Sequence, residues 1–239
     1  MKTKKKSGLA FIITVAVVII GLLVALAFLT KHQEKEIVSK LPTMEEYQKA
    51  YTGKVTGLDE NNQPVLGKKD APVKIVEFGD FKCPACAMWE QQVFPQIYSE
   101  YISSGKVQFQ FVNWQFLDVD SILAGMAGEA IYQQSNDAFW QFYKLIYEKQ
   151  GAESQKWATE AFLTKFVKEN IKADDFNYTK FEKDLKARKY MDLVRKDLLI
   201  GQKYGVSGTP SILVNGVKIE NNSYDAIKAE IENALKEEK

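Results

Sequence analysis

Residues 73–90, VKIVEFGDFKCPACAMWE, join a dense apolar run to the two cysteines of a 239-residue chain. Val73, Ile75, Val76 and Phe78 are β-branched or aromatic, which predicts a buried strand. The cysteines follow at once and stand three residues apart, with a proline directly after the first. Apolar residues then recur at helical spacing. We therefore expect a strand and a helix, with both thiols at the junction between them.

A second strand is expected at residues 107–114, VQFQFVNW, where apolar residues alternate with glutamines. The helix between the two strands should be kinked at Pro95. Strand, helix and strand form a βαβ unit that carries the thiols at the C-terminal end of its first strand. Open α/β sheets place their chemistry at that end.

The rest of the chain predicts a helical block followed by a ββα unit. From about residue 120 to residue 204, apolar residues recur at three- and four-residue spacing. The aromatic residues between 139 and 147 are expected to form a packed helix face rather than a ligand site. Residues 211–219 predict a hairpin around Asn215–Gly216, and residues 223–239 predict a final amphipathic helix.

The first thirty residues predict a membrane anchor. A basic leader precedes residues 8–30, which carry no charge over 23 positions. As a helix this segment would span ~34 Å, enough for the hydrocarbon core, and the lysines place its N-terminal side in the cytoplasm. A cleaved secretory signal is the alternative, because Ala25-Leu26-Ala27 fits a small-x-small cleavage site. We favour the anchor, because the apolar run continues through that site; either way, residues 31–239 lie outside the cytoplasm.

Residues 31–60 are expected to form a stalk. Residues 41–53 within it predict either a short helix or a solvated tether. The helix would have Thr43 and Glu46 as a capping box and Gly53 at its end.

The cysteine usage argues against two structural roles. A disulfide between Cys83 and Cys86 would close a tiny loop and remove little unfolded-state entropy. Extracytoplasmic proteins that depend on disulfides usually carry several pairs. A zinc site is not expected, because the one histidine, His32, lies beside the membrane segment and two sulfurs do not fill a tetrahedral site. The charge balance beyond the leader is slightly acidic and gives no reason to expect nucleic acid as a partner.

The positions of the two cysteines favour thiol–disulfide exchange. Pro84 suits the first helical position, since the N–H that it lacks would have no partner there. First-turn amides and the helix dipole favour a thiolate on Cys83, with a pKa of roughly 3.5–7.5 as in related motifs. Cys83 is then expected to exchange with partner disulfides, and Cys86 to be the more buried resolving thiol. A stabilised thiolate favours the reduced form, which makes the disulfide form an oxidant.

Further candidate residues flank the cysteines or lie far downstream. Glu77 ends an apolar strand; if it is buried, its pKa is raised and it could take or return the proton of the second cysteine. The alternative is an exposed glutamate at the strand end. Asp80 and Lys82 could tune the site, but we expect them at the surface. Pro210 follows Thr209 at the start of a strand, where either peptide isomer is tolerated.

Together these features resemble the thioredoxin superfamily. The resemblance rests on Cys-Pro-Ala-Cys at the head of a helix after a strand, and on Gly-Thr-Pro before a strand far downstream. The helical block between βαβ and ββα resembles the DsbA branch. Residues 64–86, PVLGKKDAPVKIVEFGDFKCPAC, and residues 139–150, FWQFYKLIYEKQ, are similar to membrane-anchored Gram-positive DsbA-like oxidoreductases of the BdbD type.

The resemblance implies roles for the site residues. Cys83 is the nucleophile, Cys86 is the resolving cysteine, and Glu77 falls where the family keeps a buried acid. The Thr209–Pro210 bond is cis, and this dipeptide faces the thiols and offers its backbone to an extended substrate segment. The inner dipeptide of the motif is Pro84–Ala85, where some relatives have a histidine, so the oxidising strength is left open.

The resemblance also implies the architecture: an α/β chain with a thioredoxin fold (βαβ…ββα), an inserted all-helical domain and one N-terminal transmembrane helix. The expected parts are the anchor at 1–30, the stalk at 31–60, a thioredoxin-fold domain at 61–118 and 204–239, and the helical insertion at 119–203. Some relatives bind a structural calcium. The acidic stretch 172–177, KADDFN, is no recognisable calcium loop, so we expect no metal.

The expected function is a thiol–disulfide oxidoreductase that introduces disulfides into unfolded exported proteins through Cys83–Cys86. No cofactor beyond this redox-active disulfide is expected, and a quinone-linked membrane oxidase would reoxidise it. The enzyme would be a single-pass protein of the cell membrane with its catalytic domain on the extracytoplasmic side. The alternatives are an extracytoplasmic reductase, for example in cytochrome maturation, and a peptide-binding holdase whose thiols are idle.

Overall fold

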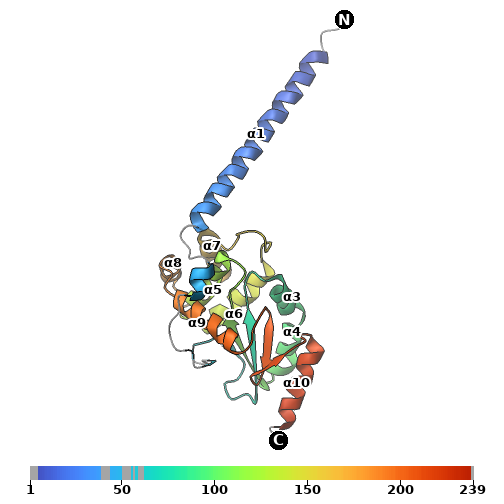
Figure 1. The fold of residues 1–239 in the computed structure, drawn as a ribbon, viewed down its shortest axis with the longest axis vertical. Coiled ribbons are helices and arrows are strands. Elements are labelled where there is room, and N and C mark those ends of the chain that lie inside the picture. Colours follow the sequence, from blue (N-terminus) through green and yellow to red (C-terminus); the bar gives the residue numbers. More distant parts are fainter. Residues whose placement is uncertain (1–4, 39–43, 50–54, 56, 59–61, 238–239) are drawn as a thin grey trace. The chain divides into compact units, whose positions relative to one another are not determined.

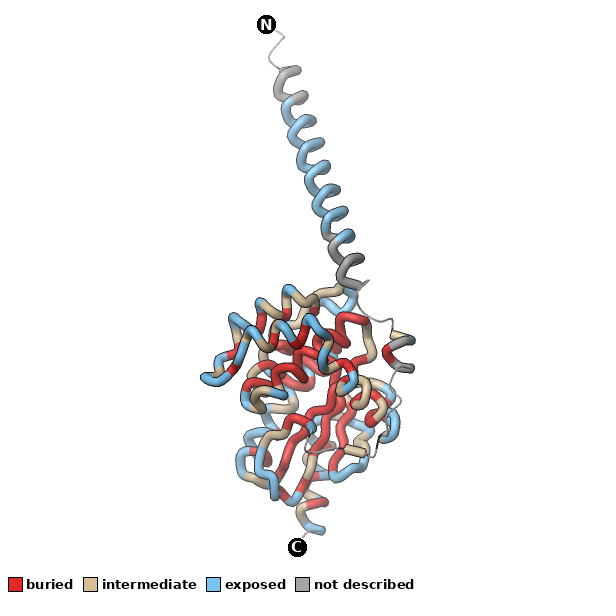
Figure 2. The backbone as a smooth tube through the Cα atoms, turned by 90° about the vertical axis from the view of Figure 1, so that its left-hand side faces the viewer, coloured by how far each residue is buried: buried red, intermediate tan, exposed pale blue. Residues whose placement is uncertain are grey.

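The computed structural model describes residues 5–38, 44–49, 55, 57–58 and 62–237. The chain forms two compact units, residues 1–41 and 42–239 (Figure 1). In the first unit, helix α1 (Lys5–Val38) contains Phe11–Leu29, a 19-residue apolar segment long enough to cross a membrane. The residues of this segment are exposed (Figure 2). The segment is therefore a candidate membrane anchor, while its cleavage and its sidedness stay predictions.

Within the described residues, the second unit is built on a five-stranded sheet with the order β1-β3-β2-β4-β5. The strands are β1 (Val65–Leu66), β2 (Val73–Gly79), β3 (Val107–Asn113), β4 (Ser211–Val214) and β5 (Val217–Ile219). β2 and β3 are parallel, whereas the other neighbouring pairs are antiparallel. The predicted βαβ and ββ units are both present. β1 is an additional edge strand that the sequence patterns did not indicate.

The crossover from β2 to β3 runs through α3 (Pro84–Gln92), α4 (Phe94–Ile97) and the π-helical turn η1 (Tyr98–Ile102). The backbone changes from α3 to α4 at Val93. Pro95 has no N–H to donate to the carbonyl group of Gln91, so a single α-helix cannot continue through this point. The helix is thus interrupted at Val93, two residues before the kink predicted at Pro95.

The predicted helical block lies between β3 and β4. Its helices are α5 (Val119–Tyr132), α6 (Asn136–Glu148), α7 (Glu160–Asn170), α8 (Tyr178–Lys186) and α9 (Met191–Lys203). Asp118, Ser135, Thr159 and Asn177 begin four of these helices, because their side chains accept hydrogen bonds from first-turn amides. α5 is the centre of the block, since it is almost wholly buried and contacts α6, α7, α8 and α9.

Helices cover both faces of the sheet. α3, α4, η1 and the C-terminal helix α10 (Tyr224–Glu237) share one hydrophobic core with β2, β3 and β4. α9 lies on the opposite face, where Gly201 packs closely against Trp114. β2, β3 and β4 are almost wholly buried, and Figure 2 shows buried backbone through the interior of this unit. Glu77 follows Val73 and Ile75 at two-residue spacing in β2, so its side chain points to the face that α3 covers.

The hairpin has the predicted turn, and β3 is the predicted strand, buried on both faces. Asn215 and Gly216 both have positive φ angles, 47° and 83°, as a type I′ turn requires. In β3, Gln108 and Gln110 are buried rather than exposed. β3 lies between β1 and β2 and is covered by helices on both faces, so alternation of residue type does not produce an exposed face there.

A short helix, α2 (Met44–Lys49), lies within the predicted stalk. Tyr47 is buried, and its hydroxyl donates a hydrogen bond to the carbonyl oxygen of Val194 in α9 at 3.0 Å. Residues 44–49 therefore pack as a helix and do not form a solvated tether. Thr43 and Gly53, the expected ends of this helix, lie outside the described residues. The domain boundaries stay predictions.

Candidate active site

The two cysteines lie at the N-terminus of α3, as the sequence predicts. Cys83 caps the helix with extended backbone (φ −74°, ψ 117°), and Pro84 occupies the first turn. Cys83 exposes 6% of its surface to solvent, whereas Cys86 is fully buried. Pro84 and Ala85 are exposed beside Cys83. A partner molecule can therefore reach Cys83 but not Cys86.

The pKa values of the two thiols are shifted in opposite directions. A hydrogen bond from the Cys86 thiol lowers the pKa of Cys83 to about 6, helped by the backbone amides of Ala85 and Cys86 and opposed by partial burial. Burial raises the pKa of Cys86 well above its ordinary value, and the hydrogen bond to Cys83 raises it further. At neutral pH the pair therefore consists of a thiolate on Cys83 and a thiol on Cys86.

The Thr209–Pro210 segment lies against Cys83, although 126 residues separate them. The Thr209–Pro210 peptide bond is cis, as the family resemblance implies. In its protonated form, the Cys83 thiol donates to the carbonyl oxygen of Thr209, with Sγ and O 3.4 Å apart. The side-chain amide of Asn222 donates to the carbonyl oxygen of Pro210 at 2.6 Å and so holds the segment from its other side.

Glu77 is fully buried on the face of β2 that α3 covers, so the exposed alternative is wrong. Its Oε2 accepts a hydrogen bond from the Tyr143 hydroxyl of α6 at 2.5 Å. Burial raises the pKa of Glu77 to about 8, although the Tyr143 bond lowers it. Oε1 is buried and has no hydrogen-bond partner among the described residues.

Comparisons with known proteins identify the family. The family model described as Thioredoxin matches residues 59–233. The chain belongs to the thioredoxin family. It is 47% identical over 176 residues to a "Probable disulfide bond formation protein D" of Bacillus anthracis, covering 74% of this chain and 80% of that protein. It is 39% identical over 175 residues to "Disulfide bond formation protein D" of Bacillus subtilis, covering 73% and 78%.

Solved structures agree with this assignment. Oxidised BdbD from Bacillus subtilis superimposes with a TM-score of 0.70 at 38% identity, covering 76% of this chain and 98% of that one. Chlamydia trachomatis DsbA has a TM-score of 0.69 at 22% identity, which supports the fold alone. The expected fold, the DsbA-like family and the class of thiol–disulfide oxidoreductase are confirmed.

Asp80 and Lys82 correct the sequence-based expectation, because both are fully buried rather than exposed. The Lys82 ammonium lies 2.7 Å from Asp120 Oδ1 and donates to the carbonyl oxygen of Gln155 at 3.0 Å. Asp80 accepts hydrogen bonds from the Ser121 hydroxyl at 2.5 Å and from the backbone N–H groups of residues 116 and 117. The inserted helical block covers this loop, and sequence patterns do not show which loop it covers.

The structure adds two residues that sequence reasoning missed. Tyr143 belongs to the aromatic face of α6, which packs as predicted, but its hydroxyl contacts Glu77. Gln150 follows α6, and its side-chain amide donates to the carbonyl oxygens of Phe81 at 2.8 Å and Cys83 at 3.1 Å. Residues 139–150 are similar to the family, but no pattern within them distinguishes these two side chains from their neighbours.

A second buried polar cluster lies between β3, α5 and α9. The Asn113 amide donates to Glu129 Oε1 at 2.6 Å, and the Gln63 amide donates to Asp197 Oδ1 at 2.5 Å. Burial, and then the charge of Glu129, raise the pKa of Asp197 well above its ordinary value. Gln63, Glu129 and Asp197 each keep one buried oxygen without a partner among the described residues. No group of three or more His, Cys, Asp or Glu side chains in the described ranges could hold a metal ion.

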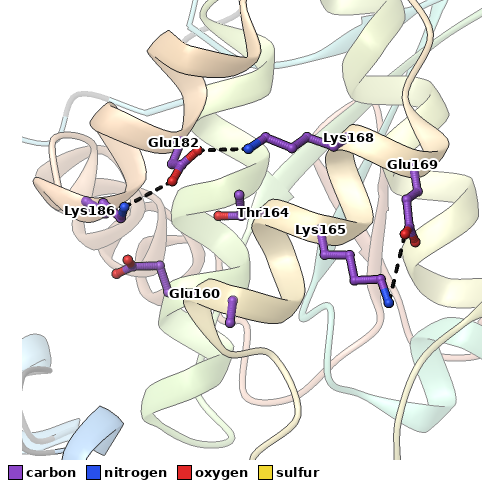
Figure 3. A pocket seen from close by; sticks show the side chains of 8 residues that line it. Glu160, Thr164, Lys165, Lys168, Glu169, Glu182 and Lys186 are labelled. Carbon is purple, nitrogen blue, oxygen red and sulfur yellow. Dashed lines mark hydrogen bonds and ion pairs between the residues drawn. The ribbon is translucent and has the colours of Figure 1, made fainter.

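A cavity of about 520 Å³ lies between α7 and α8 (Figure 3), and neither cysteine lines it. Its wall is mostly charged, and Glu182 pairs with Lys168 at 2.9 Å and with Lys186 at 3.0 Å. The two lysines are exposed and Glu182 is half-buried. We assign the cavity no role in the chemistry.

Proposed function

We propose that the protein introduces disulfide bonds into exported proteins by exchange through Cys83 and Cys86. The observation that carries the proposal is the difference between the two thiols. Cys83 has a pKa of about 6, whereas the pKa of the buried Cys86 beside it is raised. A stabilised Cys83 thiolate favours the dithiol form, so the disulfide form is an oxidant. This supports oxidation of substrates over reduction.

In the proposed reaction, a substrate thiolate attacks Cys83 Sγ and the Cys83–Cys86 bond breaks. Cys86 leaves as a thiolate and takes a proton from Glu77, which is protonated below about pH 8. A second substrate thiolate then attacks the substrate sulfur of the mixed disulfide. Cys83 leaves as a stable thiolate, the substrate has gained a disulfide, and the enzyme has gained two electrons.

Reoxidation reverses the proton transfer. As the pair returns to the disulfide, the Glu77 carboxylate takes the proton of Cys86 and a partner accepts the two electrons. We propose a membrane oxidase linked to quinone as that partner, because the candidate anchor α1 would keep the enzyme at the membrane. The cysteine pair itself is then the redox group, and no further cofactor enters the reaction.

The Thr209–Pro210 backbone is the proposed substrate platform. It lies within hydrogen-bond reach of Cys83 Sγ, next to the exposed Pro84–Ala85 dipeptide. An extended substrate segment can pair with such a backbone while its own sulfur approaches Cys83. Because this contact uses main-chain groups, it would accept many unfolded sequences.

We further propose that α1 anchors the chain in the cell membrane with residues 31–239 on the extracytoplasmic side. The lysines before the apolar segment support this orientation. Residues 61–118 with 204–239 would form the catalytic domain, and residues 119–203 the inserted domain that covers it.

Trapping tests the proposed function. Cys86→Ala removes the resolving thiol, so mixed disulfides between Cys83 and exported proteins should accumulate and disappear on reduction. The Cys83→Ser variant is the matched control and should trap nothing. The absence of adducts in Cys86→Ala would contradict substrate oxidation. Full biological function of the Cys83→Ser, Cys86→Ser double variant would instead support the holdase alternative.

Binding of a structural calcium ion is a second candidate role for the chain. Gln63, Glu129 and Asp197 offer three unpartnered, buried oxygens of the hard type that Ca²⁺ prefers, although the sequence-based expectation was no metal. A bound cation would offset the repulsion between the two carboxylates and tie residue 63 to α5 and α9. Calcium should therefore raise the melting temperature of the wild type, whereas Asp197→Asn should remove that increase. Equal melting temperatures with calcium and with a chelator would exclude the site.

A further inference from the structure

Tyr143 holds Glu77 by a buried hydrogen bond. Its hydroxyl donates to Glu77 Oε2 at 2.5 Å, and both side chains are at most 1% exposed. A hydrogen bond to an ionised acceptor is short and strong, and a buried one is not weakened by competing water. The bond therefore acts on the charge of Glu77 as well as on its orientation.

The Tyr143 ring is locked by its neighbours. It packs edge-on against Phe94, Phe111, Trp140 and Tyr147, with ring centroids 5.2–5.7 Å apart. Such contacts leave the ring one orientation, so its hydroxyl is preorganised toward β2. Glu77 does not have to hold Tyr143 in place, whereas Tyr143 does hold Glu77.

The other carboxylate oxygen of Glu77, Oε1, is buried and has no hydrogen-bond partner among the described residues. Leaving a buried oxygen without a hydrogen bond is costly, which suggests that this atom has a function. Glu77 faces α3, where the buried Cys86 must gain a proton when it leaves the disulfide.

We propose that Tyr143 is a positioning residue for disulfide exchange: it holds Oε2 of Glu77, so that Oε1 is free to exchange a proton with Cys86. This inference rests on the proton-transfer role of Glu77 in the proposed function. It adds a residue outside the cysteine motif, from the inserted helical block, to the machinery.

Several titratable groups surround Glu77. Cys83, Cys86 and Glu90 face it from α3, and Tyr143 and Tyr147 face it from α6. Burial and the charges of Glu90 and Cys83 raise the pKa of Glu77, whereas the Tyr143 bond opposes them. Without that bond, the pKa of Glu77 would be higher, and a smaller fraction of Glu77 would be ionised at any given pH.

Tyr143→Phe tests the inference through two reactions with opposite responses. One is the attack of a small monothiol on the oxidised enzyme, with the rate constant calculated from the concentration of its thiolate form. This reaction needs protonated Glu77, so its rate constant falls at alkaline pH. We expect the midpoint of this fall to move up by about one pH unit, because a hydrogen bond to a charge has that order of strength. The other is release of the same thiol from the mixed disulfide on Cys83, which needs ionised Glu77 and should slow about tenfold at pH 7.

Tyr147→Phe is the matched control. Tyr147 lies one turn further along the same buried face of α6, and its hydroxyl has no hydrogen-bond partner among the described residues. Tyr147→Phe should keep the wild-type pH profiles, and Tyr143→Phe should have no further effect in a Glu77→Gln background. If Tyr143→Phe behaves like Tyr147→Phe, or slows both reactions at all pH values, the inference is wrong. If Glu77→Gln keeps the wild-type profile, the proposed role of Glu77 fails first.

Discussion

Glu77→Gln should change the pH dependence of stability, mainly because Glu77 is buried. The pKa of Glu77 is about 8 in the folded protein, against 4.5 for a free glutamate. Between these two pH values the folded state binds one more proton than the unfolded state. Stability therefore falls as the pH rises from about 4.5 to 8, and it levels off above that range.

The size of the effect follows from the difference between the two pKa values. Each pKa unit corresponds to about 1.4 kcal/mol, so Glu77 should lower the free energy of unfolding by roughly 4–5 kcal/mol between pH 4.5 and pH 8. Glutamine has a similar shape and does not titrate. The stability of Glu77→Gln minus that of the wild type should therefore increase by this amount over the same interval.

Urea unfolding of the oxidised wild type and variant at several pH values measures this difference. The oxidised form is chosen because neither cysteine then titrates. The charge of Cys83, the smallest of the causes that raise the pKa of Glu77, is then absent, so the effect should lie at the lower end of this range. Other titrating groups cancel in the difference between the two proteins. A difference that stays constant from pH 4.5 to pH 8 would show that Glu77 is not held protonated by burial, and the proton-transfer mechanism would lose its donor.

Three further predictions concern other contacts of the site. Alkylation of Cys83 should titrate near pH 6 in the reduced wild type and at higher pH in Cys86→Ala, because the Cys86 thiol is the main cause of the low pKa; equal midpoints would contradict this. Asp120→Ala leaves the Lys82 charge buried and should cost about 3–5 kcal/mol in urea unfolding, whereas breaking the exposed Lys165–Glu169 pair by Lys165→Ala should cost at most about 0.5 kcal/mol. Gly79→Ala puts a Cβ 2.5 Å from the Phe111 ring and should cost about 1–3 kcal/mol by thermal melting, whereas Gly208→Ala has no atom within 4 Å of its new Cβ and should be close to neutral. Similar costs for Asp120→Ala and Lys165→Ala would refute the argument from charge burial, and similar costs for Gly79→Ala and Gly208→Ala would refute the argument from packing.

Much of the fold is predictable because it depends on local patterns. The apolar run before Cys83, the proline in the first turn of α3 and the Asn215–Gly216 turn each act through nearby backbone geometry. Local patterns do not show that the glutamines of β3 are buried, because exposure depends on which helices cover a strand. The surface position expected for Asp80 and Lys82 was wrong for the same reason.

What the sequence determined by itself is the pair of thiols at a strand–helix junction and, from the motifs around it, the family. Only the tertiary structure decided what surrounds the thiols. Thr209 reaches Cys83 across 126 residues, and Tyr143 reaches Glu77 across 66. Proton affinity in a buried site depends on such distant partners, since each group is stabilised by the charges and hydrogen bonds that replace water. A linear sequence names those groups, but packing of the helical block on the sheet determines which of them meet.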